Sequence, residues 1–345
     1  MILVTGGTGL LGAHLILKLL QNGQKVKAMK RAGSKTERTL HIFSFYTRDA
    51  DLLFNQIEWA DCDILDYNEV RKVLEGCSRV YHCAAMVSFN ASDREAMLET
   101  NIQGTANLVN AAMEKGIEQF CHVSSVATLG RPPKGEAADE ETYWTPSLTK
   151  QAYSISKYYS EMEVWRGIQE GLKAVIVNPS IIIGPGNWNE GSPKLFQLIS
   201  KGMKFYTTGG TGFVDVNDVA DAMILLMKPD HFKRLAAKRF VLAENSYTFQ
   251  EIFNFIADAL NVKRPSIKAS KWMLTIGWLL SSIMGFITGQ KPTLTRDSAN
   301  GSIPRRFING KKITTELNFQ YTPVKDAIQK VAAFYKADAN RRFNS

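Results

Sequence analysis

The chain opens with Met1-Ile2-Leu3-Val4-Thr5-Gly6-Gly7-Thr8-Gly9-Leu10-Leu11-Gly12, an apolar run followed by a glycine-rich turn and the start of a helical pattern. Glycines at this spacing permit a tight turn, a close approach of the backbone to a pyrophosphate, and close packing of the helix on the strand. The N-terminus of that helix adds unpaired N–H groups and the positive end of its dipole. We therefore expect a dinucleotide to bind here, through Gly6, Thr8, Gly9, Leu10, Leu11 and Gly12.

Short apolar runs alternate with helical spacing through the first half of the chain. The predicted strands are residues 1–5, 25–29, 57–61, 79–83, 119–124 and 173–178, and the predicted helices are residues 14–21, 68–74, 100–115 and 153–169. Alternating strands and helices with almost continuously apolar strands indicate a parallel sheet covered on both faces. The expected fold class is therefore α/β, a doubly wound parallel sheet of the Rossmann type.

After Asn178, Gly- and Pro-rich turns separate shorter elements. We expect residues 1–178 to form the dinucleotide-binding domain and residues 179–345 to form mainly a smaller, discontinuous substrate-binding lobe. Residues 213–219 have an extended pattern, and the range 213–228 is expected to return to the first domain.

Basic residues follow the second predicted strand, where NAD sites usually carry an Asp or Glu that accepts from the ribose 2′-OH. Lys30 and Arg31 occupy this position, Lys35 is nearby, and the stretch holds no acid. Cations here favour a 2′-phosphate and hence NADP, with NAD left open. Arg31 is preferred because a guanidinium both pairs with phosphate and stacks on adenine. Beyond the third strand, Asp63 and the adjoining Ile64 are expected beside the adenine.

Tyr153 and Lys157 are four residues apart in a predicted helix and therefore share one face. An ammonium beside a phenol stabilises the phenolate, so we expect the pKa of Tyr153 to be lowered from about 10. Such a tyrosine donates a proton to a carbonyl oxygen during hydride transfer, or removes it in reverse. Lys157 is also expected to bond the nicotinamide ribose. Ser124 and Ser125 end a predicted strand, where open α/β sheets bind ligands, and both are candidates to orient the carbonyl.

Taken in order, these motifs resemble those of the extended short-chain dehydrogenase/reductases over nearly the whole chain. The likeness includes the glycine turn, His82-Cys83-Ala84-Ala85, Asn101-Ile102-Gln103-Gly104-Thr105, Val123–Gly130, Tyr153–Lys157, Asn178-Pro179-Ser180, Gly184-Pro185-Gly186 and Phe213–Ala220. The resemblance favours Ser125 over Ser124 and leaves open whether Asn101 starts a helix or relays a proton. It implies cofactor contacts near the adenosine for Ala84 and Ala85, and near the carboxamide for Pro179 and Ile182.

Within that family the likeness is closest to dihydroflavonol-4-reductase-like proteins and 3β-hydroxysteroid dehydrogenase relatives. Val126-Ala127 stands where sugar-nucleotide dehydratases carry an Asp-Glu pair, so dehydration is disfavoured. The expected function is an NADP-dependent reductase or dehydrogenase acting on the carbonyl or alcohol of a moderately large apolar substrate. The alternatives are an NAD-dependent sugar-nucleotide epimerase and a non-enzymatic dinucleotide-sensing or scaffold protein. A homodimer through residues 100–115 and 153–169 is a family-level expectation.

The 345 residues include 42 Lys and Arg against 33 Asp and Glu, a net charge of +9. Residues 262–312 carry this whole excess, and they bracket an apolar stretch, residues 272–289. That stretch is predicted to be an amphipathic lid or pocket helix, with a membrane-surface helix as the second interpretation. An anionic apolar substrate or a lipid surface would explain the charge, whereas nucleic acid is not expected because no recognition motif is visible. Four scattered cysteines and the lack of a signal peptide indicate reduced thiols, no metal site and a cytoplasmic location.

Overall fold

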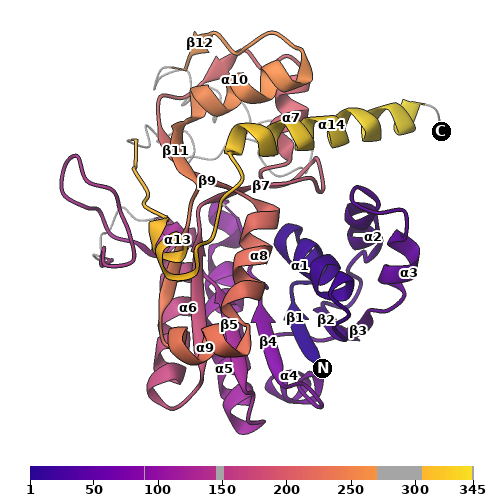
Figure 1. Ribbon diagram of the computed structural model, residues 1–345, viewed down its shortest axis with the longest axis vertical. Coiled ribbons are helices and arrows are strands. Elements are labelled where there is room, and N and C mark those ends of the chain that lie inside the picture. The colour runs from indigo at the N-terminus through magenta and orange to yellow at the C-terminus, as the bar shows by residue number, and fades with distance from the viewer. Residues whose placement is uncertain (89, 145–150, 270–304, 344–345) are drawn as a thin grey trace.

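The computed structural model describes residues 1–88, 90–144, 151–269 and 305–343. A parallel seven-stranded sheet with the order β10-β6-β5-β4-β1-β2-β3 runs through the lower part of the molecule (Figure 1). Its strands are β1 (Ile2–Thr5), β2 (Val26–Lys30), β3 (Glu58–Asp61), β4 (Arg79–His82), β5 (Gln119–Val123), β6 (Ala174–Pro179) and β10 (Arg239–Leu242). The expected doubly wound α/β fold is therefore confirmed.

Helices cover both faces of this sheet. On one face lie α1 (Leu10–Gln21), α2 (Glu37–Ser44), α3 (Ala50–Phe54), α8 (Val216–Leu226) and α9 (Pro229–Leu235), and on the other α4 (Tyr67–Val73), α5 (Arg94–Glu114) and α6 (Ala152–Gln169). Successive side chains of a strand point to opposite faces. Ile2 and Val4 of β1 are thus buried under the first group of helices, and Leu3 under the second. This double burial is why Ile2, Leu3 and Val4 are all apolar.

The strand order reverses at β1, which lies between β2 and β4. The carboxyl ends of β1 and β4 are adjacent, with Thr5 opposite His82. From there the chain leaves toward α1 on one face and α5 on the other. Open α/β sheets bind ligands at such a switch point. The glycine turn and the loop after β4 consequently border the same site.

A smaller lobe lies above the carboxyl ends of the large sheet (Figure 1). It holds a three-stranded sheet of β7 (Ile181–Ile183), β9 (Gly210–Asp215) and β11 (Asn245–Thr248), the pair β8 (Phe205–Tyr206) and β12 (Ile267–Lys268), and the helices α7 (Lys194–Ser200), α10 (Phe249–Leu260) and α14 (Val324–Phe343). Trp188, Phe196 and Ile256 are buried in its core together with apolar residues of α14. The short helix α13 (Lys311–Leu317) packs instead against β10 of the large sheet.

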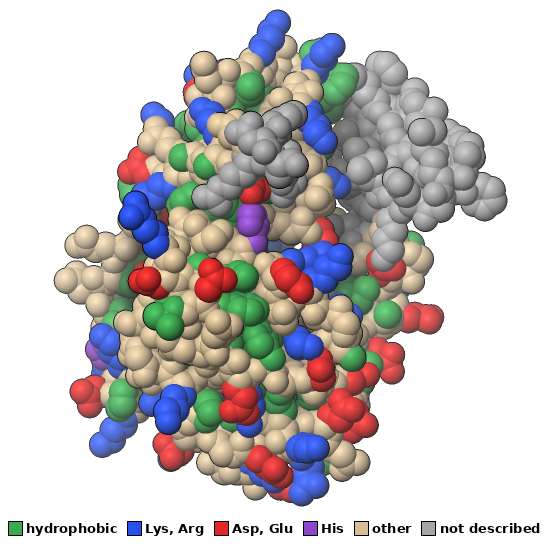
Figure 2. All heavy atoms as spheres, turned by 90° about the vertical axis from the view of Figure 1, so that its right-hand side faces the viewer, with side chains coloured by type: hydrophobic (Ala, Val, Ile, Leu, Met, Phe, Trp, Pro, Cys, Tyr) green, Lys and Arg blue, Asp and Glu red, His purple; other side chains and the backbone are tan. Residues whose placement is uncertain are grey.

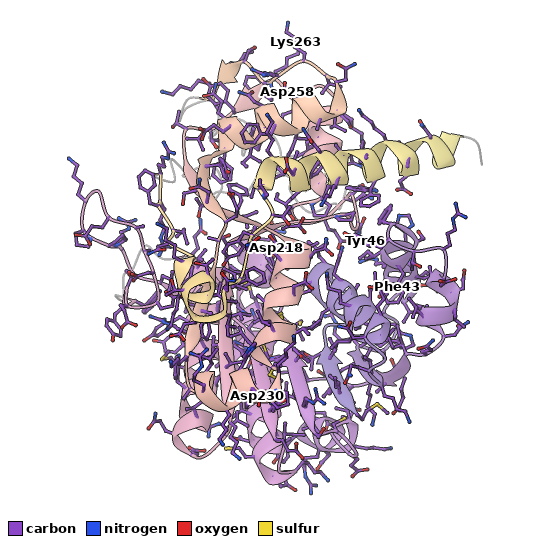
Figure 3. The ribbon with its side chains drawn as sticks, in the orientation of Figure 1. Phe43, Tyr46, Asp218, Asp230, Asp258 and Lys263 are labelled. Carbon is purple, nitrogen blue, oxygen red and sulfur yellow. The ribbon has the colours of Figure 1, made fainter. Side chains whose placement is uncertain are left out.

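The C-terminal helix α14 connects this lobe to α2 of the large domain. Phe45, just after α2, packs against Trp188 and Phe334 at ring-centroid distances of 6.1 and 5.3 Å. Tyr46 packs against Phe334 as well, and its hydroxyl lies 2.9 Å from His14 Nε2 of α1. Figure 3 shows Tyr46 below α14, on the side of the molecule that carries α1 and α2. The large domain and the smaller lobe therefore contact each other through these aromatic side chains.

The structure corrects three sequence-based expectations. Residues 213–219 are not one extended segment, because β9 ends at Asp215 and α8 begins at Val216. β9 belongs to the small sheet, while α8 packs on α1, and the additional strand β10 joins the large sheet beside β6. The helices expected at 14–21 and 100–115 start earlier, at Leu10 and Arg94.

The apolar stretch 272–289 lies outside the described residues. In the part of the chain that the structure does describe, no helix combines the length and the hydropathy needed to cross a bilayer.

Candidate active site

The turn between β1 and α1 requires its glycines for steric reasons. Gly6 has a φ of +69°, in the left-handed region, and a Cβ there would lie 2.9 Å from the backbone of Ala84. A Cβ on Gly12 would lie 2.2 Å from the carbonyl oxygen of Gly6. Gly9 is the N-cap of α1 and has no side chain to accept hydrogen bonds from the first-turn amides. This backbone cradle, followed by helix amides without a side-chain cap, fits a pyrophosphate.

The remaining residues of the turn differ in burial. Thr8 and Leu10 are half-buried, whereas Leu11 is buried in the core beneath α1. Only the backbone of Leu11 can therefore face a ligand. A Cβ on Gly186 would lie 3.0 Å from Leu10 Cδ1, so the glycine-rich segment after β7 reaches the same turn.

Cations surround the end of β2, but they are not equivalent. Lys30, the last residue of the strand, forms an ion pair with Asp61 of β3. Arg31 and Lys35 are exposed in the loop before α2. Thr39 Oγ1 of α2 donates a hydrogen bond to the carbonyl oxygen of Gly7 at 3.0 Å, so this loop is held beside the glycine turn. Arg31 is thus better placed than Lys30 to meet a 2′-phosphate.

Asp63 and Ile64 follow β3, the neighbour of β2. Asp63 is exposed, and its Oδ1 accepts a hydrogen bond from the Leu65 N–H at 3.0 Å. The Ile64 side chain is buried against Gly104 of α5, where a Cβ would lie 2.7 Å from Ile64 Cγ2. Ile64 therefore offers a ligand only its backbone.

The loop after β4 is tied to β1 through a buried histidine. Thr5 Oγ1 accepts a hydrogen bond from the Ala84 N–H at 3.0 Å and lies 2.8 Å from His82 Nδ1. On its other side, His82 Nε2 lies 3.0 Å from Thr105 Oγ1 of α5. Burial lowers the pKa of His82 to about 3, so this imidazole is neutral and structural. The contacts hold Ala84 against the glycine turn, and Ala85 is exposed beyond it.

The two candidate serines have different partners. Ser124 is buried, and its hydroxyl donates a hydrogen bond to Glu161 Oε2 at 2.5 Å. Ser125 precedes the short 3₁₀ helix η2 (Val126–Thr128), and its Oγ accepts a hydrogen bond from the Ala127 N–H at 3.2 Å. The Ser125 side chain also bonds Tyr153. The structure therefore brings Ser125, rather than Ser124, beside the tyrosine.

Lys157 lies one turn after Tyr153 on α6 and is almost completely buried. Its Nζ donates a hydrogen bond to the carbonyl oxygen of Val123 at 2.7 Å, and burial lowers its pKa to about 8. Burial raises the pKa of Tyr153, while the hydrogen bond from Ser125 opposes that rise. The expectation of a lowered tyrosine pKa was therefore wrong for this structure. Desolvation of the phenol is the larger effect, and the neighbouring ammonium donates its hydrogen bond to a backbone carbonyl rather than to the phenol oxygen.

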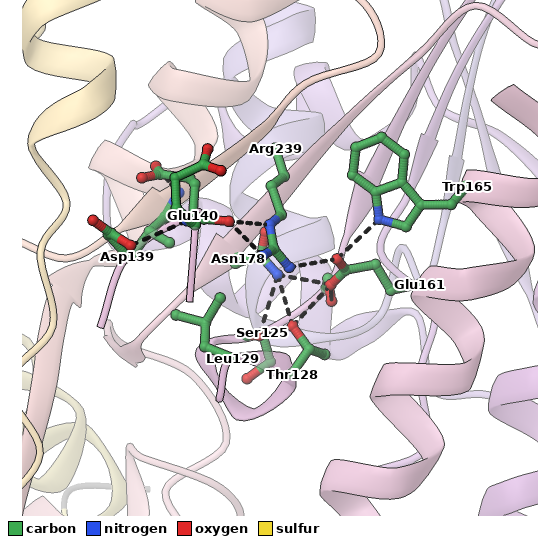
Figure 4. A network of polar contacts seen from close by, with 12 residues as sticks. Ser125, Thr128, Leu129, Asp139, Glu140, Glu161, Trp165, Asn178 and Arg239 are labelled. Atoms are coloured by element: carbon green, nitrogen blue, oxygen red, sulfur yellow. Dashed lines mark hydrogen bonds and ion pairs between the residues drawn. The ribbon is translucent and has the colours of Figure 1, made fainter. Parts of the chain in front are cut away.

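The buried carboxylate of Glu161 organises a polar network beside Ser125 (Figure 4). Glu161 is on the same face of α6, one turn after Lys157, and is fully buried. Its two oxygens accept hydrogen bonds from Ser124, Thr128, Asn178, Trp165 and Arg239. Arg239, from β10, also donates to the backbone carbonyl of Glu140. The network joins α6, η2, β6 and β10 at the carboxyl edge of the sheet.

Asn101 is a residue in the interior of α5, not at its start. Its Nδ2 donates hydrogen bonds to the Met86 carbonyl at 2.9 Å and to Ser156 Oγ at 3.0 Å, and its Oδ1 accepts from the Met86 N–H at 2.7 Å. These bonds connect the loop after β4 to α6. In this geometry Asn101 supports the backbone of the site.

Pro179 and Ile182 lie where the chain leaves the large sheet. Pro179 ends β6 and is buried, and Ile182 is half-buried in β7 opposite Val214 of β9. Both are next to the segment that carries Asn178, whose Nδ2 lies 3.3 Å from the carbonyl oxygen of Ser125. The predicted nicotinamide segment is therefore adjacent to the candidate catalytic serine.

Three residues that matter to this site were missed by sequence reasoning: Glu161, Arg239 and Arg306. Glu161 had a detectable signal, because it continues the i, i+4 face of Tyr153 and Lys157 along the helix. Arg239 and Arg306 had none, since both reach the site from parts of the chain far away in sequence.

Among the described residues, no group of His, Cys, Asp and Glu side chains could hold a metal ion. All four cysteines are free, and burial raises the pKa of the Cys62 and Cys83 thiols to about 12. On the face that carries α2 and α3, basic and acidic side chains are interspersed (Figure 2). The pairs Lys27–Glu58 and Arg38–Glu190 are examples of this mixing.

The family of this protein follows from its sequence and agrees with the geometry above. The NAD dependent epimerase/dehydratase family model matches residues 2–237, and the chain belongs to that family. It is an NAD(P)-dependent enzyme of the extended short-chain dehydrogenase/reductase type.

Individual relatives agree with this assignment. The chain is 28% identical to a Synechocystis protein provisionally named dihydroflavonol 4-reductase, over 96% of this chain and 94% of the relative. It is 30% identical to the sterol demethylase protein B of Methylococcus capsulatus, over 77% and 76% of the two chains. The crystal structure of gox2253 is similar over 98% of each chain, with a TM-score of 0.78 and 29% identity.

Proposed function

We propose that this protein is an NADP-dependent reductase or dehydrogenase that transfers a hydride between the nicotinamide and the carbonyl or alcohol of a moderately large apolar substrate. The observation that carries the proposal is that Ser125, Tyr153 and Lys157 lie together at the carboxyl ends of the strands, near the glycine turn. A tyrosine hydrogen-bonded to a serine and followed by a buried lysine is equipped to move a proton at a carbonyl oxygen.

Each of the three side chains has a distinct role. Ser125 orients the substrate carbonyl through its hydroxyl. Tyr153 donates a proton to the oxygen during reduction and removes it during oxidation. Lys157 holds positive charge near the phenol and donates to the ribose of the cofactor. The bound dinucleotide supplies or accepts the hydride.

The preference for NADP is supported by the charges at the end of β2. Lys30 is already paired with Asp61, while Arg31 is exposed in a loop that Thr39 holds next to the glycine turn. A guanidinium that has no ion-pair partner among the described residues favours, at this edge, a 2′-phosphate over a bare ribose hydroxyl. The names of the relatives, a dihydroflavonol reductase and a sterol demethylase protein, support a moderately large apolar substrate.

The test uses Tyr153→Phe, with Tyr159→Phe as the matched control. Tyr159 lies on the same helix, and its side chain is exposed. We expect Tyr153→Phe to abolish NADPH-dependent reduction across a panel of apolar ketones and aldehydes while the NADPH dissociation constant changes by less than about threefold. Tyr159→Phe should retain wild-type activity. Retained activity in Tyr153→Phe would exclude the proposed role.

The epimerase alternative makes a different prediction about the cofactor. An epimerase with tightly held NAD would bind NADH at least as well as NADPH and would interconvert sugar nucleotides without net oxidation. Titration with both reduced cofactors, followed by nicotinamide fluorescence, separates the two functions. Complete inactivity on both substrate panels, with intact cofactor binding, would favour a sensor or scaffold.

A further inference from the structure

Arg306 holds the turn that contains the candidate catalytic serine. Its Nη1 donates a hydrogen bond to the carbonyl oxygen of Val126 at 3.2 Å. Its Nη2 donates to the carbonyl oxygens of Leu129 at 2.9 Å and Gly130 at 2.6 Å. The planar guanidinium therefore spans the backbone from the first residue of η2 to two residues beyond its end.

The position of Arg306 is fixed by its own backbone. The Arg306 N–H donates to the carbonyl oxygen of Gly210 at 3.0 Å, and the next carbonyl, that of Phe307, accepts from the Ala138 N–H at 2.8 Å. The Ile308 N–H then donates to Ser246 Oγ at 2.8 Å. A segment close to the C-terminus of the chain is thus tied to β9 and β11 and carries its guanidinium to the serine turn.

The guanidinium is surrounded by carbonyl dipoles. Among the described residues the carbonyls of Val126, Leu129 and Gly130 are its hydrogen-bond acceptors, and the charge of Arg131 repels it. Burial lowers the pKa of Arg306. The ordinary pKa of an arginine is so high, however, that the guanidinium stays charged at neutral pH. A half-buried positive charge consequently lies next to the serine turn.

One of the three contacts leads directly to the catalytic groups. The Val126 carbonyl that accepts from Arg306 belongs to the same peptide group as the Ala127 N–H, and that N–H donates to Ser125 Oγ at 3.2 Å. Ser125 in turn bonds Tyr153. In a chain of hydrogen bonds each donor polarises the next, so a cation on the carbonyl strengthens the amide as a donor and then the hydroxyl as a donor.

We propose that Arg306 is a positioning residue that acts through the Val126–Ala127 peptide group to orient Ser125 and to strengthen its hydrogen bond to Tyr153. The inference rests on the proposed role of Tyr153 as the proton donor. Arg306 is one of the basic residues of the segment 262–312. In this role it acts through the backbone and does not need to contact the cofactor or the substrate.

Several other titratable groups lie on α6 or pack against it near Lys157. Lys157 lies on the same helix, Glu161 is one turn further, and Cys83 from the loop after β4 is close to Lys157. His82 and His122 are neutral because burial lowers their pKa values. None of these groups contacts Arg306, so its removal should change the titration of Tyr153 without changing theirs.

The experiment compares Arg306→Gln and Arg306→Lys with Arg305→Gln as the matched control. Arg305 is exposed, with its guanidinium 4.8 Å from the Phe307 ring, and loses the same charge one residue away. Two quantities are measured: the pH profile of kcat for alcohol oxidation, and the titration of Tyr153 by NMR of protein labelled with carbon-13 in the tyrosine rings. The Tyr153 signal is identified by its absence in Tyr153→Phe.

In Arg306→Gln we expect the pKa of Tyr153 to rise by about one unit in both measurements, since a weaker donor stabilises the phenolate less. KM should change little. Arg306→Lys should lie between the wild type and Arg306→Gln, because a lysine keeps the charge but cannot bond three carbonyls at once. Arg305→Gln should match the wild type.

Two results would overturn the inference: Tyr153 titrating as in the wild type in both Arg306 variants, or Arg305→Gln producing the same shift. If Arg306→Gln does not fold, Arg306→Lys is compared with the wild type instead. A Tyr153 titration that is identical in these two proteins excludes the role of Arg306. The NMR titration does not need turnover. A failure of the proposed function, seen as an active Tyr153→Phe enzyme, is therefore distinguishable from a failure of this inference.

Discussion

The carboxylate of Glu161 lies one helical turn beyond Lys157, and both side chains are buried beneath the candidate active site. Burial lowers the pKa of Lys157, and the charge of Glu161 opposes that change. Glu161 also accepts a hydrogen bond from Arg239 of β10. The helix that carries Tyr153 and Lys157, the candidate catalytic pair, is thus anchored to the edge strand β10 through one carboxylate.

Removing the charge of Glu161 should therefore destabilise the protein. In Glu161→Gln one carboxylate oxygen becomes an NH₂ group, which cannot accept the hydrogen bonds that this oxygen accepts in the wild type. The guanidinium of Arg239 also loses its counter-ion. We expect a loss of about 3 kcal/mol in the free energy of unfolding, measured with urea. Glu163→Gln, which removes one carboxylate from the half-exposed Arg166, should cost less than about 1 kcal/mol. Equal losses in both variants would contradict the anchoring role.

Stability should depend on pH through Lys157. Its folded-state pKa of about 8 is below the unfolded value of about 10.4, so the unfolded chain binds more protons between those limits. The free energy of unfolding contributed by this group therefore rises as the pH increases from about 8 to 10. Lys157→Met should remove that rise and stabilise the protein at pH 7 by up to about 3 kcal/mol, while abolishing activity. A rise of the same size in Lys157→Met would show that another group causes it.

The glycine turn should tolerate a methyl group at one position and reject it at another. In Gly12→Ala the new Cβ would meet the Gly6 carbonyl oxygen at 2.2 Å, so the turn must open. We expect NADPH affinity to fall at least tenfold, with a lower melting temperature. In Gly9→Ala the nearest atom is 3.2 Å away and φ is −84°, so the change should be several times smaller. Calorimetric titration of both variants measures the difference.

Cofactor preference should depend on Arg31 and not on Lys30. Arg31→Ala should weaken NADPH binding by about tenfold to a hundredfold and leave NADH binding nearly unchanged, because only the charge-assisted contacts to the 2′-phosphate are lost. Lys30→Ala should leave the ratio of the two affinities unchanged, since that ammonium is paired with Asp61. A larger change in the Lys30 variant would reverse this assignment.

The central elements of the fold could be predicted from local sequence. The strands β1 to β6 lie within about a residue of their predicted ranges. The signal is clearest in β1, β5 and β6, whose buried residues are mostly apolar, and weaker in β3, which is half-exposed. β10 was missed although Phe240, Val241 and Leu242 are apolar and buried, because so short a run does not show on its own that it pairs with β6. The start of α5 was also missed, since the apolar residues between Arg94 and Thr100 are consecutive and do not show a helical period.

Much of the candidate site was visible as a motif, but its electrostatics were not. The spacing of Tyr153 and Lys157 predicts a shared helix face, and α6 provides it. Spacing cannot reveal how deeply the two groups are buried, and burial is what raises the pKa of Tyr153 in the structure. The choice between Ser124 and Ser125 likewise depends on a partner, Glu161, that occupies one of the two hydroxyls.

The sequence by itself determined six of the seven strands of the large sheet, the glycine turn and the shared helix face of Tyr153 and Lys157, because each depends on residues that are neighbours along the chain. Only the tertiary structure decided which groups act on that pair. Arg239 and Arg306 are distant in sequence from Ser125, and they approach it because β10 joins the large sheet and the segment before α13 bonds to β9. Such long-range contacts are produced by packing and leave no periodic signal in the amino-acid sequence.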